Sequence, residues 1–233
     1  MARYTSAYSS LVTHAKEVET LQRLAARKER SDPIGCKHEI ESLSRGAVVL
    51  LCAHLEGYIK ELGEVTLDSI YKQGVDRRKI SPSVYYHISK DMLETIKNTQ
   101  NHNAISTHVF NLLQNDLEYW ERSGSFPSPI PSDRFNKGFA SPSHKKITTY
   151  LKRFGYNSFI GDMKTRLKGR YIIISNAIDH LVDTRNKIAH GDPSASKTPN
   201  ELQEMLTITK EYCRAVDSVF AFWCKNALCS IRQ

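Results

Sequence analysis

Apolar residues recur every three or four positions along most of the chain, and segments that alternate between apolar and polar residues are nearly absent. The first pattern is typical of helices with one buried face, and the second of strands. The sequence therefore predicts an all-α fold, built as a helical bundle. The expected helices lie at about 4–31, 36–70, 81–96, 105–120, 144–155, 171–190 and 198–231.

The segment 123–143 interrupts this periodicity. It contains four prolines, two glycines and six serines, a composition typical of loops. We expect a single domain over residues 1–233, with a helical insertion at about 72–165 that includes a mobile loop at 123–143. Beyond the insertion, TPNE at 198–201 predicts a helix start, because Thr198 and Glu201 have the spacing of a capping box.

The helix expected at 171–190 places an arginine among apolar residues. Its apolar stripe advances by four, three, four and three positions through Ile174, Ile178, Leu181, Arg185 and Ile188. Arg185 and His190 differ by about 140° around an unbroken helix, so they cannot meet on one face. His190 instead shares a polar strip with Asp179, Asp183 and Asn186. We expect two such helices to pack across a twofold axis, so that the apolar stripes bury each other and both arginines and histidines line one cleft.

The composition adds a basic charge to this picture. The 233 residues include 33 lysines and arginines against 25 acidic residues, a net charge of +8. This excess favours an anionic partner, with nucleic acid first and an anionic membrane surface second. The alternative is an ordinary, mildly basic soluble protein without such a partner.

The cysteines and the apolar runs indicate a cytoplasmic protein. The five cysteines have no CxxC spacing, which argues against both a disulfide framework and a zinc site. The N-terminal residues show no apolar core of a signal peptide. The longest nearly apolar run, 47–55, falls far short of the ~20 residues that a membrane helix needs.

A cleft with paired arginines and histidines suits RNA cleavage by the neighbouring 2′-hydroxyl. Imidazole titrates near neutral pH and can accept the hydroxyl proton. Guanidinium stays charged and stabilises the phosphoryl oxygens through bidentate hydrogen bonds. No carboxylate cluster or HxH spacing requires a metal. The same residues also fit an ordinary helix end, with Gly191 as a left-handed cap and Pro193 as a stop.

Two stretches resemble a known family. RNKIAHG, 185–191, is similar to the HEPN superfamily signature, in which an arginine and a polar residue are followed by a histidine; Arg185, Asn186 and His190 occupy those places. VVLLCAHLEGYIKEL, 48–62, resembles the helix of the RiboL-PSP and related stand-alone HEPN branches, where an acidic residue precedes an aromatic one, here Glu56 and Tyr58.

The resemblance implies a dimeric HEPN endoribonuclease that needs no metal or other cofactor. Such proteins are often toxins or antiviral effectors, with an antitoxin or a defence-system partner. It implies a composite catalytic site with Arg185 and His190 from both subunits, supported by Asn186, with Glu56 orienting a group in the cleft. In HEPN toxins silenced by nucleotidyl transfer a tyrosine lies two residues after the histidine; here that residue is Asp192, so we do not expect this regulation.

Two residues of the segment 48–62 have alternative interpretations. Glu56 either lies buried near Arg185 or pairs with Lys60 one helical turn later. His54 falls on the apolar stripe of its helix, which favours packing over catalysis.

Basic and aromatic residues alternate just before the motif helix. The residues expected to bind RNA are Lys164, Arg166, Lys168 and Arg170. The interleaved aromatic residues, which fit stacking on single-stranded RNA, are Tyr150, Phe154, Tyr156 and Phe159. The alternative is a solvated basic face above core aromatic residues.

Two further functions compete with the ribonuclease hypothesis. One is a non-catalytic HEPN dimer that binds RNA or a partner protein in a defence complex. The other is a structural helical adaptor, in which Arg185 makes only a buried ion pair.

Overall fold

The computed structural model describes residues 3–121, 123–192 and 194–232, and helices are the only regular elements among them. The expected all-α fold is therefore confirmed. In chain order the elements are α1 (Ser6–Ser31), α2 (Lys37–Lys72), the 3₁₀ helix η1 (Arg77–Lys79), α3 (Pro82–Ile88), α4 (Lys90–Asn98), α5 (His102–Trp120), α6 (Ser132–Asn136), α7 (His144–Lys152), α8 (Phe159–Leu167), the 3₁₀ helix η2 (Lys168–Arg170), α9 (Tyr171–Ala189) and α10 (Pro199–Ala227).

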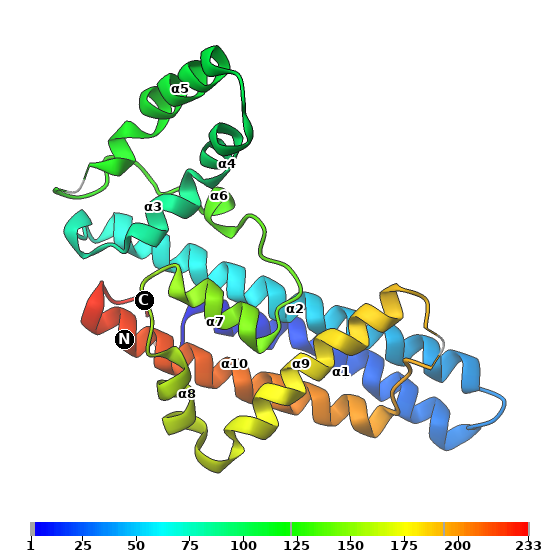
Figure 1. Cartoon of the computed structure of the whole chain (residues 1–233). Coiled ribbons are helices and arrows are strands. Elements are labelled where there is room, and N and C mark those ends of the chain that lie inside the picture. The colour runs from blue at the N-terminus through cyan, green and yellow to red at the C-terminus, as the bar shows by residue number, and fades with distance from the viewer. Residues whose placement is uncertain (1–2, 122, 193, 233) are drawn as a thin grey trace.

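The long helices α1, α2, α9 and α10 form the bundle (Figure 1). Leu55, Ile59 and Leu62 of α2 are fully buried at its centre, because α1, α9 and α10 all pack against this helix. The start of α10 matches the predicted capping box. The N–H of Glu201 donates to Thr198 Oγ1 at 3.2 Å, and the N–H of Thr198 donates to Glu201 Oε2 at 2.8 Å.

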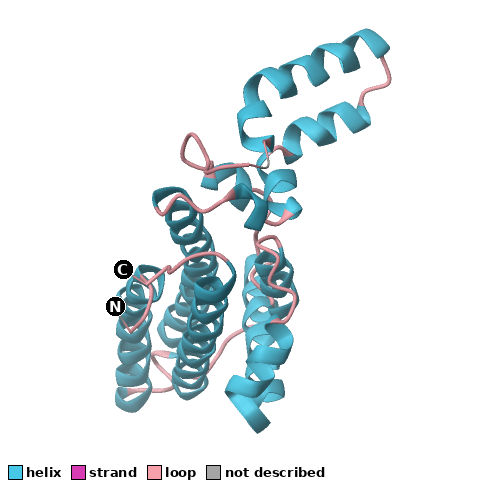
Figure 2. Cartoon of the chain, turned by 90° about the vertical axis from the view of Figure 1, so that its left-hand side faces the viewer, coloured by secondary structure: helices cyan, strands magenta, loops and turns pink. Residues whose placement is uncertain are grey.

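Helices α4 and α5 form an arm that stands away from the bundle (Figure 1, Figure 2). The single helix expected at 81–96 is two helices, because the chain turns at Ser89. The hydroxyl of Ser89 donates to Asp116 of α5 at 2.8 Å, and Asp116 is the one buried residue of α5. A buried hydrogen bond therefore fixes the break that the apolar pattern did not reveal.

The Pro- and Ser-rich segment 123–143 is anchored to the core. It contains α6, and four of its apolar side chains are no more than 6% exposed: Phe126, Ile130, Phe135 and Phe139. The predicted loop is therefore interrupted by one short helix, and its mobility stays a prediction. The segment returns from the arm to α2 and brings its last residues beside the motif helix (Figure 1).

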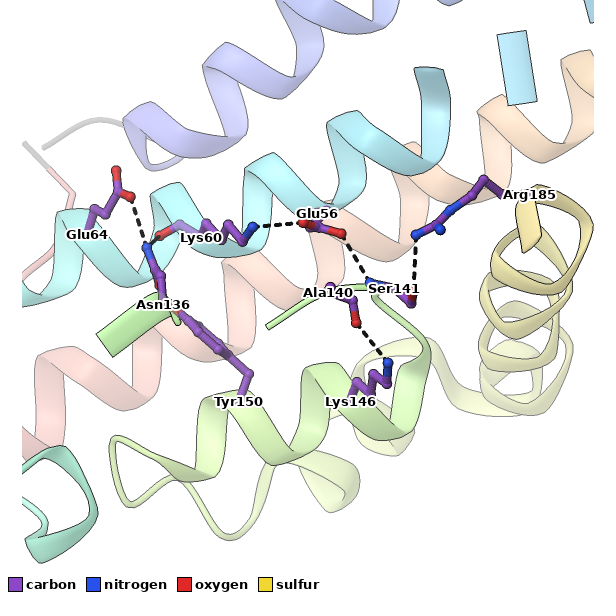
Figure 3. A network of polar contacts seen from close by, with 9 residues as sticks. All are labelled: Glu56, Lys60, Glu64, Asn136, Ala140, Ser141, Lys146, Tyr150 and Arg185. Carbon is purple, nitrogen blue, oxygen red and sulfur yellow. Dashed lines mark hydrogen bonds and ion pairs between the residues drawn. The ribbon is translucent and has the colours of Figure 1, made fainter. Parts of the chain in front are cut away.

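A close contact between α2 and α7 fixes the position of this segment. Tyr150 of α7 is fully buried and donates its hydroxyl to Asn136, which in turn donates to Glu64 of α2 at 2.9 Å (Figure 3). A Cβ atom at Gly63 would lie 1.8 Å from the Tyr150 hydroxyl oxygen. Glycine at this position therefore permits the close approach of α7 to α2.

Candidate active site

Helix α9 directs Arg185 and His190 to different sides. Ile174, Ile178 and Leu181 are at most 1% exposed, since α2 and α10 of the same chain cover them. The prediction that these apolar stripes bury each other between two copies is therefore wrong. Arg185 continues the inward stripe and is half-buried, whereas His190 is exposed.

The outward side of α9 is polar beyond its first turn, where Ile172 and Ile173 are exposed at 67% and 61%. The exposed residues that follow are spaced by four and three and end at the motif histidine: Asn176, His180, Asp183, Lys187 and His190. The predicted polar strip is divided, because Asp179 and Asn186 are half-buried. Asp179 accepts a hydrogen bond from the N–H of His144 at 2.8 Å, which ties the start of α7 to the middle of α9.

The end of α9 leaves the His190 ring in solvent. Gly191 has φ +79°, the left-handed conformation that glycine adopts without strain. Its N–H donates to the carbonyl of Ile188 at 3.0 Å and closes the last turn. The predicted glycine cap is confirmed, whereas Pro193, the predicted stop, lies outside the described residues.

Asp192 forms a turn of its own. Its carboxylate accepts hydrogen bonds from the N–H and the hydroxyl of Ser194, at 2.8 and 2.7 Å. These bonds, together with the charges of Lys187 and Arg45, lower the pKa of Asp192 below its usual value. An ionised turn residue thus stands where the nucleotidylated toxins carry a tyrosine.

A serine from the 123–143 segment holds the guanidinium of Arg185. Arg185 Nη2 donates to Ser141 Oγ at 3.1 Å, and the N–H of Ser141 donates to Glu56 Oε2 at 3.1 Å (Figure 3). The other oxygen of Glu56 accepts from Lys60 Nζ at 2.7 Å. The predicted pairing of Glu56 with Lys60 is therefore confirmed, whereas its predicted burial near Arg185 is not, because Glu56 is half-buried and reaches Arg185 only through Ser141.

Arg185 keeps an unneutralised charge. Its hydrogen-bond partner Ser141 is neutral, and within the described residues Arg185 forms no ion pair. The adaptor hypothesis required a buried ion pair at Arg185, and the structure contradicts that requirement. A half-buried cation bonded to a hydroxyl retains donors for an oxyanion.

Ser141 is the residue of the site that the sequence did not reveal. Its φ of +54° is unusual for a residue other than glycine, and such a conformation costs on the order of 1 kcal/mol. The chain holds it there between two buried neighbours, Phe139 and Pro142. A serine flanked by anchoring apolar residues was the available signal, but the sequence did not show which helix it would reach.

Cys52 closes the inner side of this site. Its thiol is 1% exposed, and burial raises its pKa, although the nearby Arg185 guanidinium acts in the opposite direction. The thiol therefore stays protonated and packs. One turn earlier on α2, Val49 is 41% exposed.

His54 lies outside this site and packs against α1. Its Nε2 is 3.3 Å from a carboxylate oxygen of Glu17, and its ring stacks on His14 with centroids 5.3 Å apart. Burial lowers the pKa of His54. The packing role that its stripe position favoured agrees with these contacts.

The residues expected to bind RNA have different surroundings. Arg170 Nη1 lies 2.7 Å from Glu211 Oε1, so its charge is compensated. The Lys164 ammonium lies 5.7 Å from the centre of the Tyr171 ring. Arg166 and Lys168 line an open groove.

The interleaved aromatic residues belong to the core. Tyr150, Phe154, Tyr156 and Phe159 are at most 2% exposed, so the prediction that RNA stacks on them is wrong. Their rings pack on one another and on α10, where Phe220 lies 5.6 Å from Phe154 between centroids. A periodic aromatic residue satisfies the pattern of a buried face as well as that of a stacking platform.

The described part of the chain also limits other classes of site. None of its helices is both long and apolar enough to cross a membrane. Within those residues, no three histidine, cysteine, aspartate or glutamate side chains are grouped as ligands for a metal ion. All five cysteines, each among the described residues, are free.

An all-helical bundle with arginine, a polar residue and histidine at the end of one helix agrees with the resemblance to the HEPN class. The RiboL-PSP-HEPN family model matches residues 13–221, and the chain belongs to this family. The match runs through 72–165, a region that the two similar stretches did not cover. No curated protein and no solved structure matches the chain.

Proposed function

We propose that this protein is a metal-independent endoribonuclease and that the C-terminal end of α9 is its active site. The observation that supports this most directly is the guanidinium of Arg185, which a neutral hydroxyl holds in place at the same end of α9 as the exposed His190. Preorganised donors that face developing charge are the largest contribution to many enzymatic rates. Membership of a HEPN family supports an RNA-related function in general.

The proposed reaction is attack of a ribose 2′-oxygen on the adjacent phosphorus. His190 accepts the 2′-hydroxyl proton, and Arg185 stabilises the phosphoryl oxygens as charge accumulates on them. The bond from phosphorus to the 5′-oxygen breaks, and this oxygen takes the proton back from the imidazolium of His190. The products are a 2′,3′-cyclic phosphate and a 5′-hydroxyl end. Asn186, half-buried next to Arg185, is the proposed supporting contact.

The active form we propose is a homodimer with a composite site. Within one chain, Arg185 faces inward and His190 outward, in line with their separation of about 140° around the helix. A second chain completes the site if it packs over the C-terminal end of α9, where the half-buried Arg185 and the exposed His190 are both accessible. Light scattering of the purified protein measures this directly, and a strict monomer at working concentration would contradict the composite site.

Cleavage of purified single-stranded RNA in the presence of EDTA tests the reaction. Arg185→Ala and His190→Ala should each lower the cleavage rate by about 10²–10⁴-fold, the range for loss of an acid–base group. The matched control is His102→Ala, because His102 is likewise exposed but lies at the start of α5 on the arm, away from α9. This control should cleave like the parent.

Two outcomes would oppose the assignment. If all three variants cleave like the parent, the active site lies elsewhere. If the parent binds RNA in a salt-dependent way but releases no product, the non-catalytic HEPN dimer is the better description.

The cellular role that we propose is that of a toxin or an antiviral effector. Induced expression of the parent should then arrest growth, and expression of His190→Ala should not. An antitoxin or defence-system partner would be recovered as the factor that relieves this arrest.

A further inference from the structure

A groove of about 450 Å³ lies between α8, η2 and α10, at the end of α9 opposite the motif. Its walls come from segments that are distant in sequence but adjacent in the fold (Figure 1). The lining residues are Asp162, Thr165, Arg166, Lys168, Ser218, Val219, Phe222 and Arg232. None of them belongs to the HEPN motif.

The groove carries cationic charge that the protein does not neutralise. Within the described residues, no carboxylate forms an ion pair with Arg166 or Lys168. The one acidic lining residue, Asp162, already accepts hydrogen bonds from the hydroxyls of Tyr156 and Ser158 at 2.7 and 2.9 Å. Arg232 also lines the groove but is paired with Asp217 at 3.4 Å, so the two unpaired cations outnumber the one lining carboxylate and make the groove suitable for an anion.

An exposed phenylalanine accompanies these cations. Phe222 is 69% exposed, a larger fraction than that of Phe110, at 58%, or Tyr86, at 41%. It lies on α10 but outside that helix's buried face, which includes Phe220 and Cys224. A solvent-facing ring offers a flat apolar surface on which a nucleobase can stack.

We infer that this groove binds single-stranded RNA away from the scissile bond. One base stacks on Phe222, while Arg166 and Lys168 contact the flanking phosphates. The hydroxyl of Ser218, which also lines the groove, is suited to hydrogen-bond the sugar or the base, and the hydroxyl of Thr165, which donates to the Gly161 carbonyl at 3.1 Å, can still accept a hydrogen bond. This inference rests on the proposed function, because it assumes that RNA is the substrate.

The location of the groove determines which RNA can use it. Helix α9 has 19 residues, so its two ends are about 28 Å apart. A dinucleotide at Arg185 and His190 cannot reach Phe222, whereas a longer strand can. The groove therefore contributes to the binding of long RNA and not to the chemistry at the motif.

A membrane surface is the competing partner for cations beside an exposed ring. The observations favour RNA, because the site is a concave groove with hydroxyl groups in its walls. A lipid surface is better matched by a convex amphipathic face. The comparison of the two ligands is therefore part of the test.

The test measures fluorescence anisotropy of labelled single-stranded RNA with full-length protein that carries His190→Ala to prevent cleavage. Adding Phe222→Ala should weaken binding by roughly tenfold or more, as for loss of one stacked base. Phe222→Trp should restore it. The matched control is Phe110→Ala on α5, because Phe110 is likewise exposed, at 58%, but lies on the arm.

The charged residues are tested through the salt dependence of binding. Arg166→Gln combined with Lys168→Gln should reduce the slope of log affinity against log salt by about 1.4, since each phosphate contact on a single strand contributes about 0.7. Arg23→Gln with Arg27→Gln, two exposed arginines of α1, removes the same charge elsewhere and should leave the slope unchanged.

Two results would overturn the inference. One is that Phe222→Ala binds RNA with the affinity of the parent and that the double variant Arg166→Gln, Lys168→Gln shows the same salt dependence as the parent. The other is binding to phosphatidylcholine–phosphatidylserine vesicles that depends on Phe222 while RNA binding does not. Failure of the proposed function would look different. If the parent protein does not cleave RNA but still binds it through Phe222, the groove proposal stands and only the proposed cleavage is contradicted.

Discussion

The cations at the two ends of α9 have different surroundings. At the C-terminal end, Arg185 is half-buried, and Ser141 and Glu56 fix its position through a chain of hydrogen bonds (Figure 3). At the N-terminal end, Arg166 and Lys168 line an open groove and have no acidic partner among the described residues. The C-terminal end of α9 thus holds the guanidinium of Arg185 in one position, whereas no acidic partner among the described residues holds Arg166 or Lys168 in place.

This difference corresponds to two tasks that the proposed ribonuclease function requires. Stabilising a transition state requires a donor that is oriented before the reaction, because reorientation would cost free energy at that moment. Binding a flexible polyanion requires mobile cations and a stacking surface, which act on many conformations and sequences. The comparison predicts that changes at the two ends alter different measured quantities.

The largest expected effect beyond the motif itself is at Ser141, a positioning residue that acts through Arg185. Ser141→Ala removes the hydroxyl but keeps the same backbone, and it should lower kcat about tenfold or more, as for loss of a hydrogen bond to a charged group. Affinity for RNA in the His190→Ala background should not change. Cleavage kinetics and anisotropy measure the two quantities.

The variant Ser141→Gly separates positioning from stability. Glycine adopts a φ of +54° without strain, so this variant should melt at or above the temperature of the parent while losing cleavage like Ser141→Ala. Ser128→Ala, in the same loop segment but hydrogen-bonded to Tyr119 of the arm, serves as the control. Equal kcat in all of these proteins would show that Ser141 does not position Arg185.

A smaller effect is expected at the groove end on acidification. The two ring nitrogens of His144 each lie 2.9 Å from a tyrosine hydroxyl, that of Tyr212 or of Tyr171 at the start of α9. Burial lowers the pKa of His144, and Asp179 only partly opposes this. His144 therefore binds a proton more readily in the unfolded chain than in the folded one, so the free energy of unfolding should fall as the pH drops below about 6.5.

Melting temperatures at neutral and mildly acidic pH test this effect. His144→Gln should lose less stability than the parent over the same pH change, even if it is less stable at neutral pH. Hydrogen exchange should show acid-induced opening at the start of α9 in the parent and less of it in His144→Gln, while opening around His87 and His54, whose pKa values burial also lowers, should be the same in both. The same pH dependence in parent and variant would assign the acid sensitivity to other groups.

The sequence predicted the arrangement of the motif, because helix geometry alone places Arg185 and His190 on different sides of α9. The capping box at Thr198 and the left-handed Gly191 were predictable for a similar reason, since each depends on neighbouring residues only. Periodicity also showed that Ile174 and Ile178 are buried, but it does not say what covers them. The chain's own α2 and α10 cover them, so the prediction that a second copy does so was wrong.

Long-range placement accounts for the other differences. Ser141 depends on a loop that crosses to α2, and its left-handed backbone is not readable from a serine in the sequence. The aromatic residues at 150–159 face the core because α10 packs over them. The exposure of Phe222 could have been predicted from the sequence, because this residue falls outside the apolar stripe of its helix. A large apolar residue on the polar side of a helix predicts an exposed contact surface.

The most direct test of the central claim replaces one hydroxyl of the substrate. An RNA that is cut at a known position is prepared with a single 2′-deoxynucleotide on the 5′ side of that bond and incubated with the parent protein and EDTA. The account predicts no cleavage at the substituted position and 2′,3′-cyclic phosphate ends at the unmodified ones. Cleavage at the deoxy position would show that water, and not the ribose hydroxyl, attacks the phosphorus, and would contradict the roles proposed for Arg185 and His190.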